Sequence, residues 1–112
     1  MSNKQYFFDK VYDIVRAIPY GKVSTYGAIG KCIGTGLSAR MVGWAMNSSH
    51  EKTPFVPAHR VVNRIGLLTG KHHFETITMM QELLEQEGLV IKEDQIINFE
   101  SHFWNPLIEL NK

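Results

Sequence analysis

The side chains best suited to moving a proton are His59 and Glu87, and both lie in segments that the sequence predicts to be buried. His59 follows prolines and apolar residues in segment 54–62, and Glu87 points to the apolar side of a predicted helix. An unpaired buried carboxylate is costly, so Glu87 needs a partner, for which His59 and Arg60 are the candidates. The alternative is that Glu87, in the last turn of its helix, reaches solvent.

The single thiol and the other histidines predict neither a nucleophile nor a metal site. Cys32 lies among apolar residues of a predicted helix, whereas a reactive thiol needs cationic or helix-terminal surroundings. We therefore expect a buried structural cysteine, and one cysteine excludes an internal disulfide. No metal-ligand spacing with Cys32 is offered by His50, His72, His73 and His102. We expect no metal and no cofactor.

A third chemical pattern lies on one predicted helix, at about residues 38–47. At ~100° per residue, one side is apolar and predicts a core face: Met41, Val42, Ala45 and Met46. The other side offers a cation, a position without a side chain, an aromatic ring and an amide: Arg40, Gly43, Trp44 and Asn47. Such a face suits a nucleic-acid groove, although a solvated face with Trp44 packed on a neighbouring segment fits the pattern equally.

Three helices are predicted in the first half of the chain. Apolar residues at helical spacing indicate a helix at about residues 4–18, stopped by Pro19. A second helix starts from Ser24 or Thr25 as its cap and runs to about Ile33, before a glycine-rich turn. Ser38 is the expected cap of the third. Two short helices joined by a tight turn, after a supporting helix, form the helix-turn-helix pattern.

The second half is predicted to hold a loop, a wing and one further helix. Segment 54–62 reads as a constrained loop leading into a small hairpin, with its turn at residues 63–66. A helix follows at about residues 75–87, with Gly88 as its stop, and the apolar segment 89–106 packs down as core cover. The expected fold class is mainly α with a small β wing, a winged helix-turn-helix, in a single domain over residues 1–112.

Composition limits the class of protein further. The chain has 112 residues, 44% hydrophobic and 21% charged, which suits one ordered domain. No apolar run approaches the ~20 residues of a membrane span, and the first residues lack the apolar stretch of a secretory signal, so we expect a cytoplasmic protein without membrane contact. Residues 1–72 carry ten basic against three acidic side chains, a net +7, whereas residues 73–112 carry two against eight, a net −6. Such a split is compatible with a surface that faces a polyanion.

Three spaced segments carry a family resemblance. IPYGKVSTYG (18–27), ARMVGWAM (39–46) and VPAHRVV (56–62) resemble, in this order, the DNA-binding domain of the O6-alkylguanine-DNA alkyltransferases. The resemblance covers about residues 5–88 and ends at Glu87-Gly88, which matches the family's Glu-Gly after its final helix.

One departure from that family decides the expected activity. The alkyltransferases carry Pro-Cys-His-Arg, whose cysteine takes the alkyl group, and here that position is Ala58. A methyl side chain has no lone pair and cannot be a nucleophile. The sequence most resembles the alkyltransferase-like branch, which binds O6-alkylguanine in duplex DNA without repairing it, shields it from true alkyltransferases and hands it to nucleotide excision repair. The resemblance thus implies no catalytic residue, a monomer, and two partners: damaged DNA and excision-repair proteins.

The same resemblance assigns residues to roles. It implies docking in the minor groove and rotation of the damaged nucleotide out of the helix, promoted by Tyr26, while Arg40 fills the gap. The start of the third helix would offer backbone N–H groups to phosphate, and Arg64 is a further phosphate contact. DNA-binding residues are then Tyr26, Ser38, Ala39, Arg40 and Arg64. The base pocket is formed by Tyr26, Met46, Ala58, Val61 and Lys71, with 67–71 as its lid and a larger volume beside Ala58. The structural network comprises His59, Arg60 and Glu87.

Several alternatives stay open at this level. Lys71 is either a pocket residue or a solvated lysine. Residues 47–53 form a longer polar connection than the family's, so its asparagine hinge is not assigned to Asn47, and the lid lacks the usual Gly-Tyr-Ser-Gly character. A base-processing hydrolase would use His59 or Glu87 to activate water. A winged-helix transcription factor would prefer a sequence and ignore damage.

Overall fold

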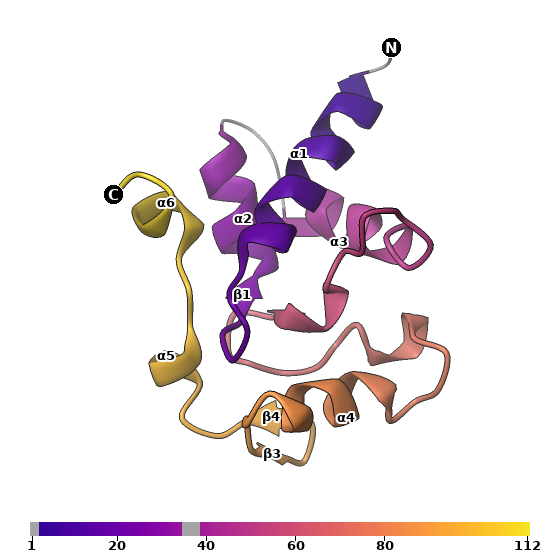
Figure 1. Ribbon diagram of the computed structural model, residues 1–112, viewed down its shortest axis with the longest axis vertical. Coiled ribbons are helices and arrows are strands. Elements are labelled where there is room, and N and C mark those ends of the chain that lie inside the picture. The colour runs from indigo at the N-terminus through magenta and orange to yellow at the C-terminus, as the bar shows by residue number, and fades with distance from the viewer. Residues whose placement is uncertain (1–2, 35–38) are drawn as a thin grey trace.

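The computed structural model describes residues 3–34 and 39–112. Three helices form its first half: α1 (Asn3–Ala17), α2 (Tyr26–Ile33) and α3 (Ala39–Asn47). Figure 1 shows them together above α4, with the chain of residues 54–62 crossing between the two groups. The three predicted helices are therefore confirmed. The predicted cap Ser38 lies outside the described residues.

Local signals explain where α2 begins and ends. The side chain of Thr25, and not that of Ser24, caps the helix, since Thr25 Oγ1 accepts a hydrogen bond of 3.0 Å from the Ala28 N–H. The helix stops at Gly34, whose φ of +133° is a backbone conformation that favours glycine.

The small sheets differ from the predicted hairpin, which is a correction. Strand β1 (Ser24–Thr25) pairs in parallel with β2 (Val61–Val62), and a short 3-10 turn, η1 (Ala58–Arg60), leads into β2. Residues 63–66 do form the predicted turn, where the Asn63 N–H donates to the Leu67 carbonyl at 3.1 Å. The two flanks pair elsewhere, however, with Leu67 bridging to Gln95. The reason is burial: both valines of β2 are covered on both sides, which a parallel, buried pair provides and an exposed wing does not.

The C-terminal half holds shorter elements than predicted. The turn η2 (Lys71–His73) precedes α4 (Met79–Gln86), so the helix starts four residues later than expected. A hairpin that we did not predict follows, with strands β3 (Ile91–Lys92) and β4 (Gln95–Ile96) paired antiparallel. Its two-residue turn, Glu93 and Asp94, has φ of +52° and +65°, the left-handed geometry of tight hairpins. Two single-turn helices, α5 (Phe99–His102) and α6 (Pro106–Glu109), end the chain.

Two apolar clusters fill the interior, and the crossing segment 56–62 belongs to both. The first cluster joins α1, α2 and α3 and includes Val56, Ala58 and Val61. The second joins β2, α4 and the β3–β4 hairpin and includes Val62 and Leu84. Segment 89–106 covers the core as predicted at buried positions such as Leu89, Ile96 and Trp104, whereas Val90 and Ile97 are exposed. In the described ranges, no helix has the length and apolar character to cross a membrane.

A glycine in the 63–66 turn provides a test of this packing. Gly66 has a φ of +84°, and a Cβ built there would lie 3.0 Å from the ring of Phe99. We expect Gly66→Ala to lower the free energy of unfolding by about 1–3 kcal/mol, because it adds both backbone strain and overpacking. Gly27→Ala is the control: a Cβ there meets nothing within 4 Å and lies in the first turn of α2. Urea denaturation measures both variants, and an equal effect would contradict this account.

Candidate functional site

The carboxylate of Glu87 is the centre of a buried polar network. Its side chain is 4% exposed, and its Oε2 lies 2.6 Å from His59 Nε2. Arg60 Nε donates to both carboxylate oxygens at 2.9 and 3.1 Å, and the Gly21 N–H donates to Oε1 at 2.7 Å. Arg60 Nη1 also donates to the Ile18 carbonyl at 2.9 Å. The predicted contact of Glu87 with His59 and Arg60 is confirmed, and the escape of Glu87 to solvent is excluded.

Proton positions in this network follow from its surroundings. Burial raises the pKa of Glu87, but hydrogen bonds from Gly21, His59 and Arg60 outweigh it, so the pKa is lowered and the group is a carboxylate. Burial lowers the pKa of His59 against the opposing influence of Glu87, which favours the neutral ring. Because a carboxylate only accepts, His59 Nε2 carries the proton and Nδ1 is an acceptor. Nδ1 is buried and has no hydrogen-bond partner among the described residues.

Four of the five predicted pocket residues surround one small hollow. Tyr26, Met46, Ala58 and Val61 line it, together with Gly70 and Phe74 among others. Its volume of about 10 Å³ is no larger than the space that one water molecule needs. The hydroxyl of Tyr26 hydrogen bonds to the side chain of Thr69 and lies 3.0 Å from where a Cβ on Gly70 would be. Segment 69–70 therefore closes the hollow over Tyr26, whose pKa is raised by burial. We call it the inner hollow.

Lys71 does not line the inner hollow, and this part of the predicted pocket is corrected. Its Nζ donates to Asp94 Oδ2 at 2.5 Å, and it lines a separate surface groove with Leu67 and His72. The physical reason is the unpredicted hairpin, whose tight turn presents the carboxylate of Asp94 to the lysine. The solvated-lysine alternative also fails, because Lys71 is only partly exposed and ion-paired.

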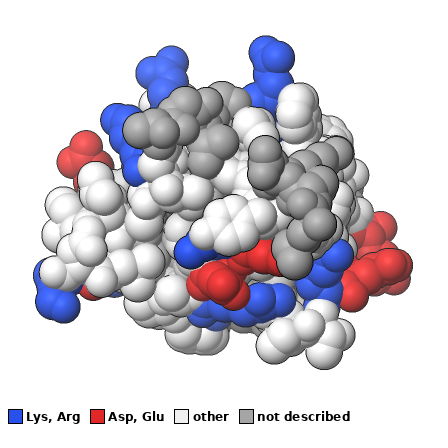
Figure 2. All heavy atoms as spheres, turned by 90° about the horizontal axis from the view of Figure 1, so that it is seen from above, with Lys and Arg blue, Asp and Glu red and all other residues white. Residues whose placement is uncertain are grey.

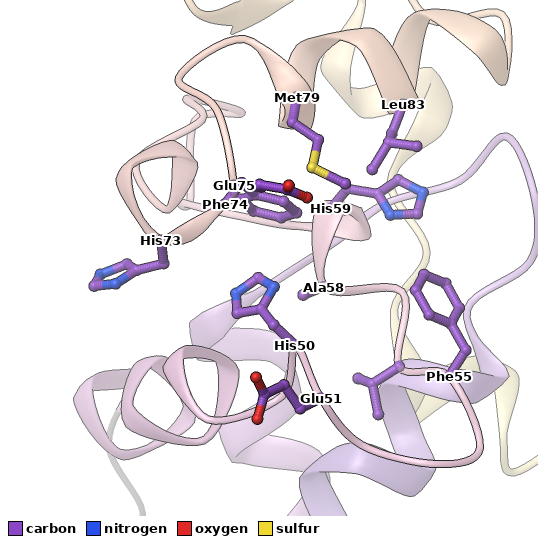
Figure 3. Close-up of a pocket in the computed structure, with 11 residues that line it drawn as sticks. His50, Glu51, Phe55, Ala58, His59, His73, Phe74, Glu75, Met79 and Leu83 are labelled. Carbon is purple, nitrogen blue, oxygen red and sulfur yellow. The ribbon is translucent and has the colours of Figure 1, made fainter.

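A larger cavity of about 420 Å³ also has Ala58 in its wall (Figure 3). It shares Ala58, His50, His73 and Phe74 with the inner hollow. The rings of His50 and Phe74 meet edge to face, with centroids 4.7 Å apart, between the two spaces. We call it the outer cavity. Its remaining lining residues are Glu51, Phe55, Val56, His59, Glu75, Met79 and Leu83.

Sequence reasoning missed most of the outer cavity. The available signals were the long polar connection 47–53, which contributes His50 and Glu51, and His73, which follows the lid. Burial and the nearby His73 lower the pKa of His50, which favours a neutral ring there as well.

The predicted two-sided character of α3 is confirmed. Val42, Ala45 and Met46 are buried, and Met41 is partly buried against the first cluster. On the other side, Arg40 and Asn47 are exposed and Trp44 is 49% exposed. A Cβ at Gly43 would meet nothing within 4 Å, so the helix backbone is accessible there. The face therefore presents a cation and an aromatic ring on either side of open backbone.

Two other predicted DNA contacts lie at exposed positions as well, whereas Tyr26 is half-buried and Ser38 lies outside the described residues. Ala39 begins α3 and is exposed, and Arg64 is exposed in the 63–66 turn.

Cys32 is partly rather than fully buried, and burial raises the pKa of its thiol, which disfavours the reactive thiolate. No cluster of metal-ligating side chains occurs in residues 3–34 and 39–112.

Charge is not segregated on the face seen from above the helices. Figure 2 shows lysine and arginine side chains next to acidic ones there, with no broad field of one sign. An ion pair of this mixed kind joins Arg16 to Asp13 at 3.3 Å. In this view, the basic side chains that give the first 72 residues their positive excess therefore do not form one uniformly positive surface.

Comparisons with known proteins identify relatives of this chain. The family described as 6-O-methylguanine DNA methyltransferase, DNA binding domain, matches residues 6–89. Alkyltransferase-like protein 1 of Schizosaccharomyces pombe is 39% identical over 104 residues, which cover 89% of this chain and 95% of that protein. A DNA base-flipping protein of Escherichia coli is 35% identical over 107 residues, covering 94% and 79%. The crystal structure of S. pombe Atl1 with damaged DNA containing O6-carboxymethylguanine matches with a TM-score of 0.78 and 39% identity, over 91% of this chain and 97% of that one.

Removing the carboxylate tests the Glu87 network. We expect Glu87→Ala to lower the free energy of unfolding by about 3–5 kcal/mol, since it leaves the Arg60 charge and three donors without their acceptor. Glu85→Gln is the matched control on the exposed side of the same helix, where a loss within about 0.5 kcal/mol is expected. Chemical denaturation of both variants measures the difference, and similar losses would contradict a central role for Glu87.

The pH dependence of stability tests the neutral state of His59. The unfolded chain binds a proton at this ring near its ordinary pKa of 6.5, whereas the folded protein binds it only at lower pH. The unfolded state therefore holds more protons below pH 6.5, and the stability present above that value is lost on acidification, at up to about 1.4 kcal/mol per pH unit. Glu87, with its pKa below the ordinary 4.5, adds a further loss as the pH falls below that value.

The measurement is the free energy of unfolding between pH 7.5 and 4.5. His59→Gln keeps a donor for Glu87 but does not titrate, so its stability should fall less steeply over this range. A slope identical to that of the parent protein would show that His59 is not the group responsible.

Proposed function

Since the chain belongs to the family of 6-O-methylguanine DNA methyltransferases and alkyltransferase-like proteins, we propose that it recognises O6-alkylguanine in duplex DNA without removing the alkyl group. The observation that carries this proposal is Ala58, which lines both the inner hollow and the outer cavity. At the position where the resemblance calls for an acceptor thiol, the site has only a methyl group. Cys32 lines neither space and has a raised pKa, so it offers no replacement.

DNA docking is assigned to the exposed face of α3, in a helix-turn-helix built from α2 and α3, with the 63–66 turn taking the place of a hairpin wing. In this proposal the helix enters the minor groove, where the open backbone at Gly43 permits close approach. Arg40 takes the place of the rotated base, and Trp44, one helical turn further, packs against the groove wall. Arg64 and the backbone N–H groups of Ser38 and Ala39 bind phosphate.

The damaged base enters the inner hollow after the lid moves. Tyr26 crowds the nucleotide backbone and then forms one wall, with Met46 and Val61 as others. Because the hollow holds about 10 Å³ in the closed protein, segment 69–70 must separate from Tyr26 before a base fits. Lys71 reaches the base only if this movement also breaks its ion pair with Asp94. An O6-alkyl group lowers the cost of extrusion because pairing is already weakened, which favours damaged over intact guanine.

The network of His59, Arg60 and Glu87 has a structural role in this mechanism. At a site without an acceptor thiol, it holds the floor of the pocket in place. We further propose that the protein acts as a monomer and that the protein–DNA complex is a signal for nucleotide excision repair. The relative from E. coli is named a DNA base-flipping protein, which supports the extrusion step.

The test compares binding to two duplexes that differ only in one O6-methylguanine. We expect at least tenfold tighter binding to the damaged duplex across a range of salt concentrations, and Arg40→Ala and Tyr26→Ala should each remove most of that preference. Emission of Trp44, which is exposed while Trp104 is 9% exposed, should change on binding. Mass analysis of the DNA after long incubation should find the alkyl group unchanged.

The control variant is Leu107→Ala, on the exposed surface of α6, which should bind as the parent does. Equal affinity for the two duplexes would refute lesion recognition. Loss of the alkyl group or of the base would instead support the hydrolase that uses His59 and Glu87. A preferred DNA sequence without regard to damage would support a transcription factor.

A further inference from the structure

We propose that the outer cavity selects among O6-alkylguanines by the end of the substituent, accepting ends that donate hydrogen bonds and rejecting anionic ends, with Glu75 as the main determinant. This inference rests on the proposed function, since it requires the damaged base to occupy the inner hollow. It concerns a space that the recognition of guanine itself does not use.

The route from the base to the outer cavity passes Ala58. Its methyl group lines both spaces, and it stands at the position that faces the alkyl group in the family resemblance. The side chains of His50, His73 and Phe74 also line both spaces. A substituent on O6 therefore points past Ala58 into a volume of about 420 Å³, which a methyl group alone does not fill.

The polar side chains that line this cavity are two carboxylates and three histidines, His50, His59 and His73. Glu51 and Glu75 contribute carboxylates, and in Figure 3 the carboxylate of Glu75 lies on the Phe74 and Met79 side of the cavity. His59, whose side chain is 5% exposed, forms a wall of the same cavity, while its Nδ1 is buried and has no hydrogen-bond partner among the described residues. Among the described residues that line the cavity there is neither lysine nor arginine.

Such a lining discriminates by charge more than by size. A hydroxyl, amide or ammonium end finds the carboxylates of Glu51 and Glu75 as acceptors, whereas a carboxylate end meets like charge and neither lysine nor arginine among the described lining residues. Glu75 is exposed, so solvent screens its effect and the discrimination is moderate, about three- to tenfold in affinity. The S. pombe relative was crystallised with a carboxymethyl adduct, and this chain is expected to bind that adduct less well than a neutral one of equal size.

The experiment uses duplexes that carry O6-carboxymethylguanine or O6-carbamoylmethylguanine at one position, because these substituents have nearly the same size and differ in charge and donor capacity. The parent protein is expected to bind the amide three- to tenfold more tightly than the carboxylate at low salt. Glu75→Gln should reduce that ratio to below twofold. Glu85→Gln, a charge change on the exposed side of α4, should leave the ratio as in the parent, and circular dichroism confirms that each variant is folded.

Two outcomes overturn the inference while leaving the proposed function intact. One is equal affinity of the parent for the two adducts, with both preferred over unmodified DNA. The other is an unchanged ratio in Glu75→Gln. If neither adduct nor O6-methylguanine is preferred over unmodified DNA, the proposed function itself fails and the inference fails with it.

Discussion

The buried carboxylate of Glu87 is the interaction on which the geometry of the site depends. It accepts hydrogen bonds from the turn at Gly21 and from His59 and Arg60, so it joins segments that are 66 and 28 residues away in the sequence. Burying a charge is unfavourable unless it is well compensated, and here a cation and N–H donors surround it. Because Arg60 also binds the Ile18 carbonyl, the end of α1, segment 56–62 and the end of α4 are held in one fixed relation.

That relation explains why the short segment 56–62 can serve two apolar clusters at once. Ala58 and Val61 pack with the three N-terminal helices, while Val62 packs with α4 and the β3–β4 hairpin. Its pairing with β1 adds only two residues of strand, so the polar network supplies much of the definition that a longer sheet would provide. Both spaces beside Ala58 thus lie where segment 56–62 joins the two clusters.

The sequence predicted those features that depend on local pattern or on the cost of an unpaired charge. The faces of α3 follow from helical spacing, and the partners of Glu87 follow from its direction toward the core. The parallel pairing of β2 was not predicted because nothing in its two valines indicates which distant strand they pair with. Lys71 was misplaced since its partner, Asp94, sits in a hairpin turn that lacks the usual glycine. The outer cavity was missed because its walls come from three separate segments.

At a site without an acceptor thiol, the Glu87 network also limits which proton transfers are possible. In the neutral ring of His59, Nε2 donates to Glu87, and the remaining nitrogen, Nδ1, is buried without a hydrogen-bond partner among the described residues. Such an arrangement cannot donate a proton toward the pocket without first protonating a ring whose pKa burial lowers. Acid catalysis at the base is therefore disfavoured near neutral pH, and the ring of His59 serves as a buried wall of the outer cavity. Under the proposed function, a pair of side chains able to move protons serves to shape and line a pocket.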